Sequence, residues 1–106
     1  MPVRRPSLWK RRAERLAKIL PRERLHPAVL GWAAAAPEDE PWAVAFSGGA
    51  DSLALLLLLW AHWPERRRRL YVLHFDHQLR GAASKADKAF SRRVCAALGL
   101  KFRAGV

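Results

Sequence analysis

The six residues SGGADS, positions 47–52, place small side chains, hydroxyls and one carboxylate between an apolar run and a leucine-rich run. Gly48 and Gly49 have no side chains, so the backbone there can turn tightly and approach a ligand closely. A helix that begins near Asp51 would direct free amide groups and the positive end of its dipole at an anion, and Ser47 and Ser52 add hydroxyl donors. Asp51 would repel phosphate, which suggests that it holds Mg²⁺, orients a nucleophile or caps the helix. The residues favour a phosphate site, and the alternative is an ordinary glycine-rich turn capped by Asp51.

Patterns typical of strands and helices alternate after residue 41. Apolar runs at 42–46 and 70–75 predict strands, 51–62 and 84–98 predict helices, and LKFRAGV at 100–106 resembles the opening of a third strand. Ser84 and Asp87 have the spacing of a capping box, and Gly99 fits a helix stop. This alternation predicts a parallel sheet with right-handed crossovers, covered on both faces. Ligands would then bind at the carboxyl ends of the strands, where SGGAD and DHQLRGAAS both fall.

Residues 1–40 have a different character, with nine Lys or Arg against five acids. Ser7 predicts the cap of a helix over residues 8–20, which Pro21 ends. A second short helix over 26–36 starts with Pro27 in its first turn. The acidic PEDEP is then a linker. We therefore divide the chain into a basic helical extension with its linker, 1–40, and the start of an α/β domain, 41–106.

The composition fits one small domain that binds a polyanion. The chain has 106 residues with 20 Lys or Arg against 9 Asp or Glu, a net charge of +11. Cys95 is the only cysteine, which excludes an intramolecular disulfide and suggests a small buried hydrophobe in a reducing compartment. The apolar run 53–63 is too short to span a membrane, so we expect a core helix. No secretory signal is visible, and we expect a cytoplasmic protein without membrane contact.

Two segments together carry a resemblance to a known family. SGGADS followed by LALLLLL resembles the PP-loop of the ATP pyrophosphatase superfamily, and it matches neither G-x-x-x-x-G-K-[ST] nor G-x-G-x-x-G. The segment 73–100 is similar to the one after the second strand in tRNA(Ile)-lysidine synthases, which have H-x-x-H-x-L-R followed by spaced Ser, Asp and Phe. The matching residues are His74, His77, Leu79, Arg80, Ser84, Asp87 and Phe90. The resemblance covers about residues 26–106. It implies an α/β fold with a parallel sheet, a Rossmann-like PP-loop domain of the adenine nucleotide alpha hydrolase type, incomplete here.

The resemblance also implies an activity and a site. Such enzymes cleave ATP between the α and β phosphates with Mg²⁺, adenylate the wobble cytidine of an isoleucine tRNA with a CAU anticodon, and release pyrophosphate. The ε-amine of free L-lysine then displaces AMP. By motif position, Asp51 would be the catalytic residue and Mg²⁺ ligand, and main-chain atoms around Ala45, Phe46 and His74 would border the adenosine. The residues carried over as ATP-binding are Ser47, Gly48, Gly49, Ala50, Asp51 and Ser52, and those at the pocket rim are Phe46, His74, Asp76, His77 and Arg80.

Several other residues have simpler interpretations. His74 ends a strand and is expected to pack, and the chain offers no third ligand near His74 and His77 for zinc. Residues 66–69, four arginines, are expected to be a solvated charge run at the amino end of the second strand. Arg92 and Arg93 fit the wet face of their helix. The basic residues of the first helix either bind tRNA backbone or are only a solvated surface. Trp42, Trp60 and Trp63 are expected in the core.

The family's domain continues through more strands and a later motif rich in His and Asp. We therefore expect the chain to be the N-terminal piece of an enzyme that, alone, binds ATP weakly or not at all and does not modify tRNA. Two alternatives remain. A PP-loop tRNA thiolase would need cysteines for sulfur transfer, which a single helical Cys95 does not favour. A nucleotide- or RNA-binding remnant would keep the loop without catalysis.

Overall fold

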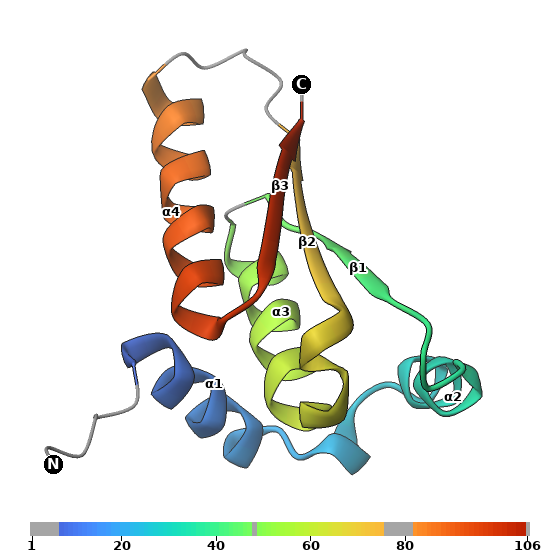
Figure 1. Ribbon diagram of the computed structural model, residues 1–106. Helices are drawn as coiled ribbons and strands as arrows, with labels where there is room; N and C mark the ends of the chain where they lie inside the picture. Colours follow the sequence, from blue (N-terminus) through green and yellow to red (C-terminus); the bar gives the residue numbers. More distant parts are fainter. Residues whose placement is uncertain (1–6, 48, 76–81, 106) are drawn as a thin grey trace, which may run out of the picture.

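The computed structural model describes residues 7–47, 49–75 and 82–105 and shows an α/β chain (Figure 1). The predicted alternation of strands and helices after residue 41 is confirmed. The elements, in chain order, are α1 (Leu8–Ile19), η1 (Arg22–Arg24), α2 (Pro27–Ala35), β1 (Trp42–Ala45), α3 (Ala50–His62), η2 (Pro64–Arg69), β2 (Leu70–Phe75), α4 (Ala82–Leu98) and β3 (Lys101–Gly105), where η denotes a 3₁₀ helix.

The three strands form one parallel sheet in the order β1-β2-β3. Trp42 lies beside Leu70 and Val44 beside Val72, and Val72 in turn lies beside Phe102. Because the strands are parallel, their carboxyl ends share one edge of the sheet, as predicted. The strands β1 and β2 both end at this edge, which we call the loop edge (Figure 1). The opposite edge, where the strands begin, is the amino edge.

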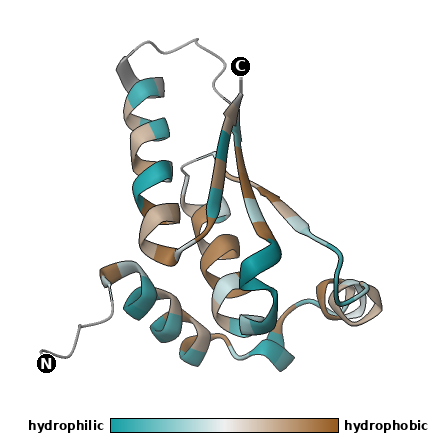
Figure 2. Ribbon diagram, in the orientation of Figure 1, coloured by the Kyte–Doolittle hydropathy of each residue, from teal (hydrophilic) through white to brown (hydrophobic). Residues whose placement is uncertain are grey.

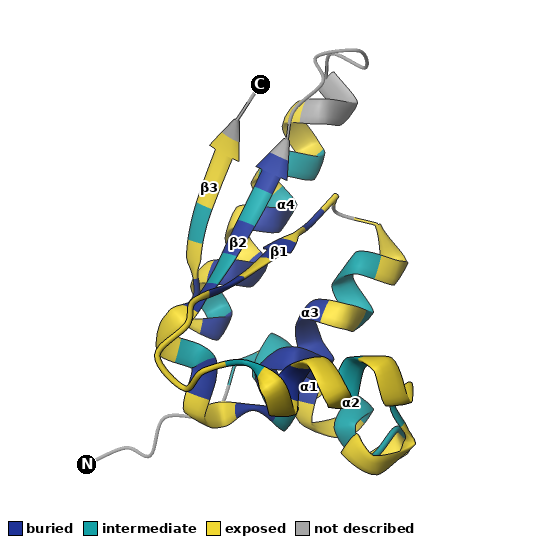
Figure 3. Cartoon of the chain, turned by 90° about the vertical axis from the view of Figure 1, so that its right-hand side faces the viewer, coloured by how far each residue is buried: buried dark blue, intermediate teal, exposed yellow. Residues whose placement is uncertain are grey.

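Burial alternates along the strands, so the described residues cover one face of the sheet only (Figure 3). In β1, Trp42 and Val44 are buried while Ala43 and Ala45 are exposed. Their buried neighbours in β2 include Val72, which is 0% exposed. The expectation that both faces are covered is therefore wrong for these residues. Two successive crossovers of the same hand place their helices on the same side of a sheet. The crossover helices α3 and α4 accordingly lie on one side.

Helix α3 is the centre of the core, as its leucine run predicted (Figure 2). Five consecutive residues, from Leu56 to Trp60, are buried, because α3 touches α1 and α4 as well as the sheet. The indole Nε1 of Trp60 donates to the carbonyl oxygen of Leu98 at the end of α4, at 2.9 Å. Trp42 and Trp63 are buried as well, which confirms the prediction for all three tryptophans. None of the described helices has the length and apolarity needed to cross a bilayer.

Helix α1 lies across the C-terminal ends of α3 and α4, at the amino edge. Ser7 is its N-cap, as predicted: the Ser7 Oγ accepts from the Lys10 amide at 3.2 Å and donates to Ala97 O of α4 at 3.3 Å. At the other end, His62 Nε2 of α3 donates to Leu20 O at 2.9 Å. Ala13, between these two contacts, is 0% exposed. The basic extension is thus packed on the core, and the division at residue 40 stays a prediction.

The sequence-based prediction is confirmed at the C-terminal end of α4 and wrong at its N-terminal end. Gly99 has φ 71°, a conformation that suits glycine, and Leu100 N donates back to Cys95 O at 2.8 Å. This confirms Gly99 as the helix stop. The predicted capping box is wrong, since α4 begins at Ala82 and Ser84 lies inside the first turn instead of at the N-cap.

Candidate functional site

The backbone between β1 and α3 is held by a network of two serine hydroxyls. Ser47 N–H donates to Ser52 Oγ at 3.3 Å, and the two hydroxyl oxygens are 3.0 Å apart. Gly49 N–H donates to Ser47 Oγ at 3.2 Å, and Ser52 Oγ donates to Gly49 O at 3.3 Å. Ser52 therefore accepts from Ser47 and donates to Gly49, which fixes the end of β1 relative to the first turn of α3. A methyl group on Gly49 would lie 3.3 Å from Ser47 Oγ, so the loop also needs a small residue there.

Helix α3 begins at this loop with backbone amides that can accept an anion. Gly49 is its N-cap, with φ −81° and ψ 170°, and among the described residues no side chain caps it. The amides of the first turn therefore point toward the loop, where the helix dipole also favours negative charge. Asp51 is the second residue of the helix and is exposed. The alternative in which Asp51 caps α3 is wrong, and its exposed carboxylate is placed where a ligand or a cation could meet it.

His74 joins the ends of β2 and β1 from inside the protein. Its Nδ1–H donates to Phe46 O at 2.8 Å, and its ring stacks on that of Phe102 with centroids 6.2 Å apart. His74 is 4% exposed and Phe46 is 1% exposed. The prediction that His74 packs is confirmed. Both side chains are buried, so the main chain of these residues is the part suited to bordering a ligand, and their place at a pocket rim stays a prediction.

Several predicted site residues lie outside the described residues, namely Gly48, Asp76, His77 and Arg80. Within residues 7–47, 49–75 and 82–105, no three His, Cys, Asp or Glu side chains come together to hold a metal ion. Mg²⁺ does not need such a cage, because it commonly takes one or two carboxylates, waters and substrate phosphates. The exposed carboxylate of Asp51, beside an anion-binding helix start, fits this mode.

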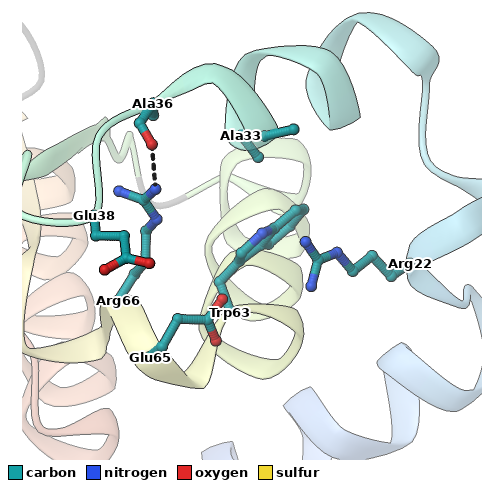
Figure 4. Close-up of a pocket in the computed structure, with 8 residues that line it drawn as sticks. Arg22, Ala33, Ala36, Glu38, Trp63, Glu65 and Arg66 are labelled. Carbon is teal, nitrogen blue, oxygen red and sulfur yellow. Dashed lines mark hydrogen bonds between the residues drawn. The ribbon is translucent and has the colours of Figure 1, made fainter.

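The amino edge has a different chemistry, visible around a pocket of about 460 Å³ (Figure 4). Arg66 is only 8% exposed, and its guanidinium donates to Ala36 O and Pro37 O, both at 2.9 Å. It also lies over the ring of Trp42, 4.2 Å from the centroid. The prediction that residues 66–69 are a solvated run is wrong for Arg66, because its hydrogen bonds fasten the turn that leads into β1. The pocket's remaining charged side chains are Arg22, Glu38 and Glu65.

Arg67 is the second arginine with a structural role. Its Nε donates to Trp60 O at 2.7 Å, and its guanidinium lies 3.6 Å from the centroid of the Trp60 ring. Burial lowers the pKa of Arg67, an effect that the nearby carboxylates of Glu14 and Glu65 oppose. The sequence did carry a signal for these contacts. Arginines that follow a helix often bind its last carbonyls, and Arg67 does so five residues after the end of α3.

Cys95 is 0% exposed in the last turn of α4. Burial raises the pKa of its thiol to about 11. The thiol is therefore neutral at physiological pH and packs as a hydrophobe, as the sequence predicted.

The fold and the loop define a class: a parallel α/β domain whose first strand leads through SGGADS into a helix start that can bind an anion. A model of the PP-loop domain family matches residues 15–105. The chain belongs to this family, which confirms the resemblance drawn from the loop.

Three curated proteins with sequences similar to this chain have the same name. The chain is 49% identical over 57 residues to the tRNA(Ile)-lysidine synthase of Symbiobacterium thermophilum, a match that covers 54% of this chain and 12% of that protein. It is 48% identical over 59 residues to the enzyme of the same name from Chlorobaculum tepidum, covering 56% of this chain and 18% of the relative. For the one from Caldanaerobacter subterraneus the identity is 35% over 65 residues, 61% of this chain and 14% of the relative. The chain thus spans less than a fifth of the length of these curated relatives.

Proposed function

We propose that the chain supplies the ATP-binding part of a tRNA-modifying ligase. The observation that carries this proposal is the start of α3, where amides without a side-chain cap lie beside the hydroxyls of Ser47 and Ser52. Such a site suits the phosphates of a nucleotide. The family match and the names of the relatives support ATP and tRNA as the ligands.

Each loop residue has a role in this proposal. The backbone of residues 47–50 and the two serine hydroxyls bind the ATP phosphates, and Gly48 belongs to this set by its place in the motif. Asp51 holds Mg²⁺, which neutralises phosphate charge while the bond between the α and β phosphates breaks. The main chain near Ala45, Phe46 and His74 borders the adenosine. Asp76, His77 and Arg80 complete the rim by motif position.

The details of the proposed reaction are taken from the name of the relatives. The RNA would be the isoleucine tRNA with a CAU anticodon, whose wobble cytidine receives AMP from ATP as pyrophosphate leaves. Free L-lysine would then displace AMP through its ε-amine and form lysidine. The setting for this reaction would be the cytoplasm, where tRNA, ATP and lysine occur together.

Two alternatives make different predictions. A thiolase would transfer sulfur through a reactive cysteine, but Cys95 is buried and its pKa is about 11, so a thiolate does not form there. A remnant that only binds RNA would not depend on the carboxylate of Asp51.

The test compares the 106-residue chain with the gene product. By gene product we mean the protein encoded by the reading frame that contains these residues. Radiolabelled lysine, ATP and the isoleucine tRNA are supplied, and label in the RNA is measured. We expect incorporation by the gene product that requires ATP, and none by the 106-residue chain. Absence of incorporation together with ATP-dependent sulfur transfer would favour the thiolase. Efficient incorporation by the 106-residue chain would show that residues 1–106 already form a complete site.

A further inference from the structure

The outer face of α1 and the following turn carry a concentration of positive charge. Residues 7–25 hold seven Lys or Arg and two Glu. Arg11, Arg15 and Lys18 are all exposed. At 3.6 residues per turn they fall within about 60° of one another around the helix. Arg22 and Arg24 of η1 continue the charge beyond the end of α1 and are exposed too.

The single acid of α1 does not neutralise this face. Glu14 acts on Arg67 of η2, where its charge opposes the effect of burial on the arginine's pKa. Its carboxylate therefore lies on the flank of α1 that adjoins η2. Glu14 is three residues from Arg11 and four from Lys18, so it borders the basic side chains on the helix surface, and the face keeps an excess of positive charge.

We propose that this face, formed by Arg11, Arg15 and Lys18 with Arg22 and Arg24, binds the phosphate backbone of a structured RNA. Lysine and arginine on one exposed helix face are suited to phosphates, whose neutralisation releases counterions. The proposal goes beyond the proposed function because it assigns a second RNA contact, far from the loop. It takes the RNA as ligand from that proposed function and does not depend on the reaction.

The place of α1 determines which part of the RNA it can meet. The helix lies across the C-terminal ends of α3 and α4, as the contacts of Ser7 and Leu20 show. The loop lies at the other end of α3, whose 13 residues extend about 20 Å. One RNA that reaches both must therefore extend past the nucleotide that enters the site. This requirement favours a stem adjoining a loop, such as the anticodon arm of a tRNA, over a short oligonucleotide.

An anionic membrane is the other polyanion that a basic helix can bind. Leu8 and Ile19 of α1 are 47% and 69% exposed. A helix that lies in a membrane surface needs a broad apolar face. The apolar face of α1 is instead packed on the core, where Ala13 is buried and Trp9 and Leu16 pack. Two separate apolar side chains do not replace that face, so the surface favours RNA.

The test compares two triple variants of the 106-residue chain with equal changes of charge. One is Arg11→Gln, Arg15→Gln and Lys18→Gln, and the control is Arg68→Gln, Arg92→Gln and Arg93→Gln, three exposed arginines elsewhere. Fluorescence anisotropy with labelled isoleucine tRNA, without ATP, gives the affinity over a range of salt concentrations. Circular dichroism confirms that both variants fold.

We expect the α1 variant to bind at least tenfold more weakly and to lower the salt slope by about 3, the value for three lost phosphate contacts on a duplex. The control should stay within about threefold of the unchanged chain. Equal losses in both variants, or no loss in either, would overturn the proposal. Tighter binding to phosphatidylserine vesicles than to tRNA, lost in the α1 variant, would assign the surface to membranes instead. Because the measurement contains no ATP or lysine, a failure of the proposed reaction leaves its result unaffected.

Discussion

The two edges of the sheet use polar residues in opposite ways. At the loop edge, Ser47 and Ser52 bond to each other and to the backbone of their own loop, and the amides that begin α3 keep free directions. At the amino edge, Arg66 donates to three carbonyl oxygens, those of Ala36, Pro37 and Glu40. Among the described residues, the amides that begin α3 are left for a ligand, whereas the guanidinium of Arg66 is held by carbonyls of the fold.

This difference shows that a basic run in a sequence can serve the fold instead of a ligand. The four consecutive arginines 66–69 are the most basic run in the chain, yet Arg66 and Arg67 have structural partners. The loop SGGADS has a net negative charge, and we nevertheless propose it as the phosphate site. The proposal rests on backbone amides at a helix start, which need no cationic side chain to bind an anion. Four predictions test the contrast, beginning with the largest expected effect.

Replacement of Asp51 by Asn should have the largest effect, because it removes the proposed metal ligand while keeping the size of the side chain. We expect pyrophosphate release by the gene product to fall about a thousandfold, equivalent to about 4 kcal/mol. Asp39→Asn, an exposed acid at the amino edge, is the matched control and should leave the rate unchanged. An active Asp51→Asn protein would show that the carboxylate of Asp51 is not needed for the reaction.

Replacement of Arg66 by Met should destabilise the fold at the amino edge without changing the affinity for ATP. The carbonyls of residues 36, 37 and 40 would lose their donor, and we expect the free energy of unfolding to fall by about 3 kcal/mol. Urea unfolding measures this change. Arg68→Met, at an exposed position, should change the stability by less than about 0.5 kcal/mol. Equal effects at both positions would mean that Arg66 has no special role.

The buried thiol of Cys95 predicts a loss of stability in alkali. Its pKa is about 11 in the folded chain against 9.0 for an unperturbed thiol, so above pH 9 the unfolded chain releases the proton first. The stability should be insensitive to this group below pH 9 and should fall by about 2 kcal/mol as the pH rises to 11. The comparison with Cys95→Ala isolates the effect, since that variant lacks the titration. Parallel pH curves for the two proteins would show that the thiol is not protected.

Replacement of Ser52 by Ala should have the smallest effect, and it should appear at the loop edge alone. The variant loses the acceptor for Ser47 N–H and the donor to Gly49 O. We expect ATP to bind about fivefold more weakly, equivalent to about 1 kcal/mol, by titration calorimetry with the gene product. Ser91→Ala, which removes a hydroxyl inside α4, is the control and should leave the affinity unchanged. An unaltered affinity in Ser52→Ala would mean that the hydroxyl network does not shape the phosphate site.

The fold was largely predictable because its signals are local. Ser7, Pro27 and Gly99 act on the backbone within a few residues, and the apolar runs fix the strands and α3. The candidate loop site could be proposed for the same reason, since SGGADS is continuous in the sequence. The start of α4 was predicted two residues too late. Ser84 and Asp87 have the spacing of a capping box, although both lie inside the helix.

What the sequence did not reveal depends on distant contacts. The role of Arg66 needs residues 36–40 to lie beside it, and that arrangement exists only when α2 and η2 have both packed. The exposed face of the sheet was missed because apolar runs suggest two buried faces. Small residues such as Ala43 and Ala45 fit an exposed strand face as well as a buried one.

Hydrogen exchange of the gene product, with and without saturating MgATP, tests the central claim most directly. The account predicts slower exchange of the amides of Gly49 to Leu53, where the phosphates would bind, and unchanged exchange in residues 64–69. Protection at the amino edge instead, or no protection of the loop at saturation, would contradict it.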